Sequence, residues 1–252
     1  QFTENQRWEK LTDRKQRYGY GAAATYYILP SLQAKVSFER AYRMPEAVEM
    51  FGDGLVQKAN PDLKPESSNN LNAGLLFDQT LGDHRLQAEV NYIYRDTKDF
   101  ILKGVSLSSN PTTSYDNLGK VQTRGVEASL SYAYKQAFHV NGNLTYQDIK
   151  DKMRYQQSEN TFVGDGISEN ITYGQRLPNI PYLFMNGHAD YQFVDLGAKG
   201  NTLSLNYDVN YVHDYYLSFT GLGAKATKKV IPEQLSHNVS LGYSLCDGRY
   251  SI

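Results

Sequence analysis

Apolar and polar side chains alternate along most of the chain. In the segment 33–39, Ala34, Val36 and Phe38 are separated by polar or charged residues, and in 18–28 the even positions carry Tyr, Ala and Ile. Strict alternation of this kind is typical of a β-strand with one apolar face. The chain is therefore expected to form strands whose two faces differ in chemistry.

The same alternation recurs through the rest of the sequence. It is found in the segments 70–77, 86–95, 126–134, 138–146, 183–193, 203–211 and 238–245, with Ile93 as an exception. Asp247-Gly248 is a hairpin-turn signal near the end of the chain. We predict nine full strands and the first residues of a tenth.

The connections between these segments alternate strictly between short and long. Short ones fall near 30–32, 78–85, 135–137, 194–201 and 246–248, and long ones at 44–66, 100–119, 148–175 and 213–231. In an antiparallel up-and-down sheet, this places all short turns on one rim and all long loops on the other. Outer-membrane barrels have this asymmetry, with short periplasmic turns and long extracellular loops.

Aromatic side chains support the same architecture. They lie on the apolar positions near the predicted strand ends, as pairs at 92 and 94, 132 and 134, 191 and 193, and 207 and 211. Barrels in membranes carry such aromatic girdles at both interfaces. The prediction is an all-β, antiparallel up-and-down transmembrane barrel, of which this chain supplies only part.

Three other β architectures fit less well. A soluble β-sandwich also alternates, but the segments here often reach ten residues, longer than the usual strand of about five or six. A β-helix or propeller needs a fixed repeat length, and the sequence has none.

Composition narrows the possible functions. The chain of 252 residues has 21 tyrosines, 20 glycines and one tryptophan, which favours strands and turns. No apolar stretch is long enough for a membrane-spanning helix, and the mean hydropathy is −0.58. With 26 basic and 27 acidic residues, the net charge of −1 offers no basic stripe for nucleic acid.

The single cysteine and the N-terminal sequence point to no particular function. Cys246 is alone, so we expect no intrachain disulfide and no thiolate metal cluster. The polar start of the chain contains no apolar signal region, so an exported protein has lost its signal or this chain is not the start of the gene product.

Catalytic motifs are weak. His213-Asp214 and two Gly-Asp-Gly triplets, at 52–54 and 164–166, occur in turn-forming contexts and lack the spacing of a calcium loop. Five scattered histidines without paired cysteines make a zinc site improbable, and no serine lies in a Gly-x-Ser-x-Gly context. We expect no enzymatic activity, no metal site and no cofactor.

The long connection after residue 43 carries the most specific signal. FERAYRMPEAVEMFG (38–52) and NPDLKPE (60–66) resemble a motif region of TonB-dependent outer-membrane receptors, and RLPNIPYLFMNGHADY (176–191) is similar to a late-strand phrase of that family. The matching motif residues are Arg43, Pro45, Phe51, Gly52, Asn60, Pro61, Leu63, Pro65 and Glu66.

The resemblance implies a 22-stranded barrel occluded by a plug domain and driven by the TonB complex. Residues 1–252 would supply about 9–10 of these strands, with the plug and remaining strands absent from the chain. It implies import of a scarce nutrient, most often a ferric siderophore. The alternatives are import of cobalamin, haem or an oligosaccharide by the same mechanism, or a passive porin; an outer-membrane barrel enzyme is more distant.

The resemblance also implies partners and candidate sites. Besides TonB, the plug, the rest of the barrel and outer-membrane lipid, the partner is a small molecule or metal chelate; nucleic acid is not expected. The candidate ligand-binding residues in the long loops are Arg43, Tyr115, Arg154, Tyr155 and Tyr215. The polar positions of the alternating strands would face the lumen and the plug. They include Lys35, Glu39, Glu89, Arg95, Glu127, His188, Asp190 and Asp208. Ordinary solvation of a wide lumen explains each lumen residue at least as well.

Overall fold

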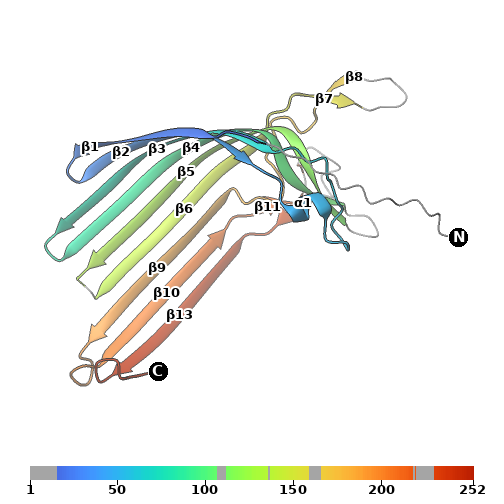
Figure 1. Cartoon of the computed structure of the whole chain (residues 1–252). Helices are drawn as coiled ribbons and strands as arrows, with labels where there is room; N and C mark the ends of the chain where they lie inside the picture. The colour runs from blue at the N-terminus through green and yellow to red at the C-terminus, as the bar shows by residue number, and fades with distance from the viewer. Residues whose placement is uncertain (1–15, 107–111, 136, 159–165, 218, 220–229) are drawn as a thin grey trace.

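The computed structural model describes residues 16–106, 112–135, 137–158, 166–217, 219 and 230–252. Within them, one ten-stranded antiparallel sheet follows chain order, β1-β2-β3-β4-β5-β6-β9-β10-β13-β14 (Figure 1). Its strands are Tyr20–Leu29, Leu32–Arg43, Glu66–Leu81, His84–Ser106, Thr112–Tyr134, Phe138–Asp151, Leu183–Val194, Thr202–Val212, Gln234–Leu245 and Tyr250–Ser251. The nine full strands and the beginning of a tenth are thereby confirmed.

In the described part of the chain, a short helix and four short strands lie outside the ten-stranded sheet. The helix α1 spans Ala47–Phe51, the strands β7 (Tyr155–Ser158) and β8 (Gly166–Glu169) pair with each other, and so do β11 (Tyr215–Tyr216) and β12 (Val230–Ile231). All of them lie at the long-loop end of the sheet (Figure 1).

Register keeps the two faces of the sheet chemically distinct. Val36 is opposite Ala73, which is opposite Tyr92, while on the other face Lys35 is opposite Gly74 and Gly74 opposite Asn91. A slip of one residue would exchange the faces. The alternation in the sequence therefore fixes which side chains share a surface.

The short turns have the backbone conformation that tight hairpins need. At β3–β4, Gly82 has φ 59°, and at β13–β14 Cys246 and Asp247 have φ 53° and 57°. Positive φ values match the twist of the flanking strands. The predicted short connection at 78–85 is in fact only two residues, because β3 continues to Leu81 and β4 begins at His84.

The predicted long loop at 100–119 is mostly strand. β4 runs to Ser106 and β5 begins at Thr112, and pairing continues to Ser106 opposite Thr112. Gly104 and Ser106 lie near the end of β4 and Asn117 lies within β5, whereas 107–111, which also suggested a loop, lie outside the described residues. The start of β5 also bonds to the segment between β2 and β3, where the Thr113 N–H donates to the Val56 carbonyl at 2.9 Å and the Thr113 carbonyl accepts from the Lys58 N–H at 2.8 Å.

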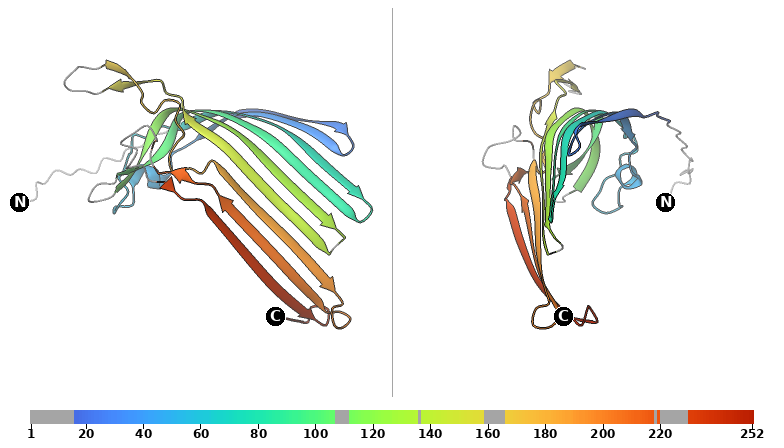
Figure 2. Two further views of the ribbon diagram at one scale, coloured as in Figure 1. Left: turned by 180° about the vertical axis from the view of Figure 1, so that it is seen from behind. Right: turned by 90° about the vertical axis from the view of Figure 1, so that its left-hand side faces the viewer.

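The sheet is a single curved layer with a concave and a convex face (Figure 2). Few side chains are buried in it; Leu63 and Val121 are each 1% exposed and Ile101 is 6% exposed. These three belong to the long-loop end, where the segment between β2 and β3 folds under the arch (Figure 2). Apolar side chains on the convex face, such as Val90 and Leu75, are about half exposed.

Among the described residues, no helix is long and apolar enough to cross a membrane.

Candidate functional site

The segment 44–65, called the rim loop below, is anchored by one arginine and two carboxylates. Arg43 ends β2, and its Nη1 lies 3.1 Å from Oε1 of Glu49 while its Nη2 lies 3.0 Å from Oε1 of Glu66. Glu49 is 6% exposed and also accepts a hydrogen bond from the backbone N–H of Glu46, at the start of α1. Burial strengthens such charge-assisted contacts.

A second set of contacts ties the loop to β5. The Asn60 side chain donates to the carbonyl of Tyr115 at 2.8 Å, and the Asn117 side chain accepts from the N–H of Lys64 at 2.7 Å and donates to its carbonyl at 3.0 Å. Leu63 lies between the two anchors and is buried. The Asn-Pro-Asp-Leu-Lys-Pro-Glu segment thus covers the upper part of the strand pair β4–β5.

A glycine and an aspartate shape the tip of the rim loop. Gly52 has φ 69°, and an added Cβ would lie 2.3 Å from the Gln57 carbonyl oxygen, so only glycine fits. The Asp53 carboxylate accepts hydrogen bonds from the N–H groups of Leu55, Val56 and Gln57. These backbone donors, Gln57 foremost, hold the pKa of the Asp53 carboxyl below its usual value.

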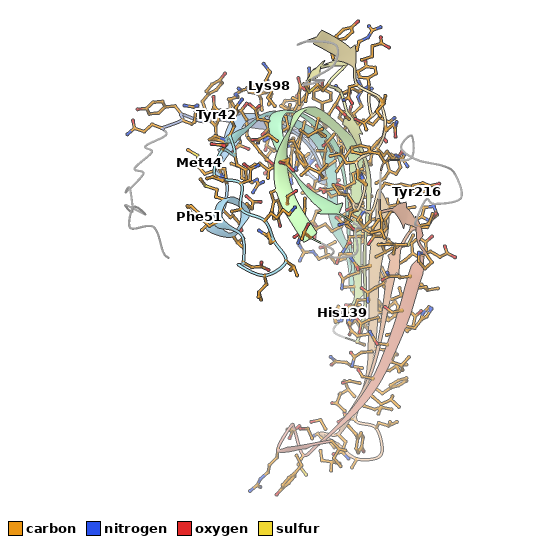
Figure 3. All side chains as sticks on the ribbon, turned by 90° about the vertical axis from the view of Figure 1, so that its right-hand side faces the viewer. Tyr42, Met44, Phe51, Lys98, His139 and Tyr216 are labelled. Carbon is orange, nitrogen blue, oxygen red and sulfur yellow. The ribbon has the colours of Figure 1, made fainter. Side chains whose placement is uncertain are left out.

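The rim loop lies on the inner side of the arch. Figure 3 places Met44 and Phe51 there, whereas Tyr42 and Lys98 lie along the outer side. Phe51 is 67% exposed and Leu55 89% exposed, so the anchored loop carries apolar side chains on its surface. The prolines Pro45, Pro61 and Pro65 occur where the chain leaves β2 and returns to β3, which restricts the loop backbone.

Of the predicted lumen residues, several meet on the concave face. Lys35 reaches over Gly74 to Glu89, with Nζ 3.2 Å from Oε1. Glu39 accepts a hydrogen bond from Asn70 at 3.5 Å. Arg95 and Glu127 are exposed on the same face.

A chain of histidines and aspartates crosses three strands of this face. Asp190 lies between His139, at 2.9 Å, and His188, at 3.4 Å, and His188 also lies 2.7 Å from Asp208. The predicted residues His188, Asp190 and Asp208 are therefore brought together, and His139 joins them without having been predicted as a site residue.

The polar surface beside this chain is hollowed. A shallow depression of ≈ 490 Å³ is lined by Asn141, Asn143 and Asn186 together with His188 and Asp208. Amide, imidazole and carboxylate groups can donate and accept hydrogen bonds. Such a surface suits polar side chains of a docked protein segment or a hydrated solute.

The predicted ligand residues do not converge on one point. Tyr115 lies beside the rim loop with the Lys103 ammonium 5.6 Å from its ring centroid, and Arg154 stacks on Tyr155 at 5.5 Å in a different loop. Tyr215 pairs with Ile231 in the β11–β12 ribbon. Arg43 is held by two carboxylates rather than presented as a free cation.

A carboxylate at the base of the third long loop is buried, and it was not predicted as a site residue. Asp151 is 0% exposed and accepts from the Met153 N–H at 2.8 Å, the Asn170 side chain at 2.7 Å and the Thr172 hydroxyl at 2.5 Å. The alternation ends before this residue, so nothing in the local pattern distinguished it from the other acids of the loop. Glu49 was missed for the same reason.

Within the described part of the chain, no group of three or more His, Cys, Asp or Glu side chains could hold a metal ion. The candidate site thus consists of the polar concave face of the sheet and the rim loop at its long-loop end. Long strands, an open sheet in chain order, short turns at one end and structured loops at the other define a wall segment of an outer-membrane type of β-barrel.

The sequence matches the family described as "TonB dependent receptor-like, beta-barrel" over residues 4–250. The chain therefore belongs to the TonB-dependent receptor β-barrel family, whose members lie in the bacterial outer membrane. A relative from Formosa agariphila, "TonB-dependent receptor P26", is 28% identical over 131 residues, which cover 52% of this chain and 13% of that protein.

Solved structures agree in fold. The siderophore receptor PirA from Acinetobacter baumannii has a TM-score of 0.61 at 18% identity, covering 92% of this chain and 35% of that one. The copper transporter OprC has 0.61 at 18%, covering 89% and 31%, and a mutant of the ferric enterobactin receptor PfeA from Pseudomonas aeruginosa has 0.58 at 18%, covering 91% and 33%. The chain thus spans about a third of these structures. The family to which it belongs is one of receptors.

Proposed function

We propose that this chain forms part of the wall and rim of a receptor that actively imports a scarce nutrient, with a ferric siderophore as the favoured ligand. The observation that carries the proposal is the rim loop, which Arg43, Asn60 and Asn117 fix in place above the concave face. A ligand-selective mouth needs side chains held in place, whereas a passive porin does not.

Active import needs more than this chain. We propose that a plug domain and the remaining strands, outside residues 1–252, complete a 22-stranded barrel, and that the TonB complex acts through the plug. The polar concave face supports this, because Lys35–Glu89 and the His–Asp chain offer ionic and hydrogen-bonding partners to a docked, movable domain.

The choice of siderophore draws on two supports. Tyr115 with Lys103, and Tyr155 with Arg154, pair aromatic rings with cations at the long-loop end, a combination that suits an anionic, aromatic metal chelate. Two of the solved neighbours are a siderophore receptor and a ferric enterobactin receptor by their titles. Cobalamin, haem and an oligosaccharide are the alternative cargoes for the same machinery.

Uptake of radiolabelled iron chelates by a deletion strain tests the proposal. Restoring the natural full-length gene should restore uptake of at least one ferric chelate, and only while the TonB system is intact. Unchanged uptake of every iron chelate in the deletion strain would sink the siderophore assignment. TonB-independent passage of small solutes would instead indicate a porin.

A matched pair of variants tests the role of the rim. Arg43→Gln removes the charge that holds Glu49 and Glu66, so uptake should fall several-fold at equal amounts of receptor in the membrane. Arg85→Gln removes an arginine whose partner, Asp78, lies near the turn end, 3.1 Å away, and should leave uptake unchanged. Equal uptake by the two variants would show that the contacts of Arg43 with the rim loop have no role in uptake.

A further inference from the structure

The convex face of β2–β6 carries a band of cations just beyond its aromatic side chains. Three rows of cross-strand neighbours contain it. One row runs Tyr42, Ser67, Lys98, Lys120; the next runs Arg40, Asn69, Asp96, Gln122, Lys150; the third runs Phe38, Leu71, Tyr94, Arg124, Asp148. All these positions continue the apolar parity of their strands, so they lie on the convex face rather than over the lumen.

The basic residues of these rows, with Arg176, which bonds to Asp148, form what we call the outer basic belt. Its members are Arg40, Lys98, Lys120, Arg124, Lys150 and Arg176. Among the described residues of the three rows, only Asp96 and Asp148 are acidic, which leaves an excess of four positive charges.

The height of the belt matches the edge of a bilayer. The ten residue steps from His84 to Tyr94 on β4 cover about 33 Å along the strand. A strand tilt of about 40° converts this to a height of about 25 Å, which is the height of the apolar band of outer-membrane barrels. Lys98, Lys120 and Arg40 follow directly beyond Tyr94 and its neighbours, at the level of the lipid head groups.

The opposite edge of the same face lacks these charges. At the turn end, the convex positions of β4–β6 are occupied by His84, Leu86, Tyr132, Tyr134 and Phe138. Aromatic rings of this kind occur at both interfaces of membrane proteins. Among the described convex positions within β4–β6, the cations therefore lie at the long-loop edge, which in this family faces the cell exterior.

Tyrosines and carboxylates hold the belt in position. The Arg176 guanidinium lies 4.2 Å from the ring centroid of Tyr182, donates to the Tyr146 hydroxyl at 3.0 Å and to Asp148 at 2.6 Å. Lys150 contacts the same Asp148 at 2.7 Å, and Lys120 contacts Asp96 at 3.2 Å.

Enough of each cation remains open to bind an anion. The side chains of Lys120, Lys150 and Arg176 are 44%, 37% and 40% exposed, and Lys98 and Arg124 are exposed. The strands that carry the belt lie inside the sheet, each with a neighbour on both sides, so completion of the barrel leaves their convex face open to lipid.

We propose that the outer basic belt is a binding site for the phosphate groups of an anionic lipid head group in the outer leaflet of the membrane. Cations on neighbouring strands, such as Lys98 opposite Lys120, with guanidinium groups among them, match the multiple charged oxygens of a phosphorylated lipid. The apolar side chains below, such as Val90 and Val126, would contact its acyl chains. The proposal rests on the outer-membrane location of the family and not on the nature of the imported ligand.

Native mass spectrometry of the full-length receptor in detergent tests the site. The probes are a bisphosphorylated acylated disaccharide lipid, the same lipid without its phosphates, and the phosphorylated disaccharide without acyl chains. We expect the bisphosphorylated lipid to bind at least tenfold more tightly than the dephosphorylated one, and this preference to weaken as salt is raised. The disaccharide without acyl chains should bind weakly.

The triple variant Lys120→Gln, Lys150→Gln, Arg176→Gln should abolish the preference for phosphate. The matched control is Arg85→Gln with Lys135→Gln, two cations near the turn end, which should leave it intact. Heat-modified electrophoretic mobility shows whether each barrel is folded, and binding of the dephosphorylated lipid by the folded triple variant gives an internal reference.

Three outcomes would overturn the proposal. The first is equal binding of the phosphorylated and dephosphorylated lipids by the natural protein. The second is an undiminished phosphate preference in a folded triple variant. The third is loss of a co-purifying acidic protein from that variant with lipid binding unchanged, which would assign the belt to a protein partner. A receptor that fails in the iron-uptake test can still pass this one, so the two proposals fail separately.

Discussion

The chain reverses direction differently at the two ends of the strands. At the turn end, antiparallel strands reverse in a few residues, using positive φ at positions such as Gly82 and Asp247. At the long-loop end, the chain builds small structures with their own buried side chains, as Leu63 and Asp151 show. The turn end is determined by backbone geometry, and the rim by specific side-chain contacts.

This difference affects which positions can change in sequence without disturbing the fold. The short turns leave little surface that could vary without breaking the hairpin. The rim offers anchored segments whose exposed side chains, including Phe51 and Leu55, can change while Arg43, Asn60 and Asn117 keep the backbone in place. The exposed positions of the rim loop can therefore change in sequence more freely than the positions of the short turns.

Replacing Leu63 with alanine should have the largest effect on this contrast. The side chain is 1% exposed, and its truncation leaves a cavity under the rim loop that costs about 3 kcal/mol of local stability. Amide hydrogen exchange of residues 46–66 should accelerate strongly, while the paired strands β3 and β4 beside the turn at 82–83 keep their protection.

Leu81→Ala is the matched control for that variant. Leu81 is 66% exposed at the turn end, so the same truncation there should change little. Similar exchange patterns in the two variants would show that the rim loop has no core of its own.

Asp151→Asn should have an intermediate effect, on the third long loop. An amide offers one oxygen where the carboxylate uses both, so the contacts with Met153, Asn170 and Thr172 cannot all be kept. Loss of one buried hydrogen bond costs about 2 kcal/mol. Limited proteolysis should cut within 152–176 faster than in the natural protein.

Asp83→Asn provides the comparison at the turn end, since Asp83 is 63% exposed and pairs with Lys135. It should leave the cleavage rate at 152–176 unaltered. If Asp151→Asn is cleaved at 152–176 at the same rate as the natural protein, the buried hydrogen bonds of Asp151 do not protect that loop.

The smallest effect is a pH dependence at the tip of the rim loop. Because backbone N–H donors lower the pKa of Asp53 in the folded state, its stabilising contribution is full above the unfolded pKa of about 3.9. The contribution is lost as pH falls through the lower, folded pKa. Exchange at Leu55, Val56 and Gln57 should therefore rise in acid.

Asp53→Asn removes the titrating group, and its exchange at these three amides should not depend on pH in that range beyond the intrinsic chemistry. A pH response that persists in this variant would assign the effect to another group.

The fold could be predicted from the sequence because alternation, turn residues and loop lengths are local and repeat at every strand. The alternation at 33–39 and at 70–77 places Lys35 and Gly74 on one face, and the structure confirms that arrangement. The extension of β4 and β5 beyond residue 100 was not predicted, because Gly104 and the residues near 110 resemble loop sequence and the pairing depends on the other strand.

The candidate sites were less accessible to prediction. Parity placed His188, Asp190 and Asp208 on the polar face, but their contacts depend on the register between β9 and β10 and on His139 from β6. The partners of Arg43 could not be inferred either, since Glu49 and Glu66 lie 6 and 23 residues away with a helix between them. Pairing across that distance is set by how the loop folds and not by local pattern.

The rim loop also has a consequence for the order of assembly. Its anchors to β5 join Asn60 and Lys64 to residues 53 to 56 positions later in the chain. Contacts of such sequence separation form slowly, after the intervening hairpin is in place. The loop between β2 and β3 is therefore made early during synthesis but can reach its final shape only once the first residues of β5 have joined the sheet.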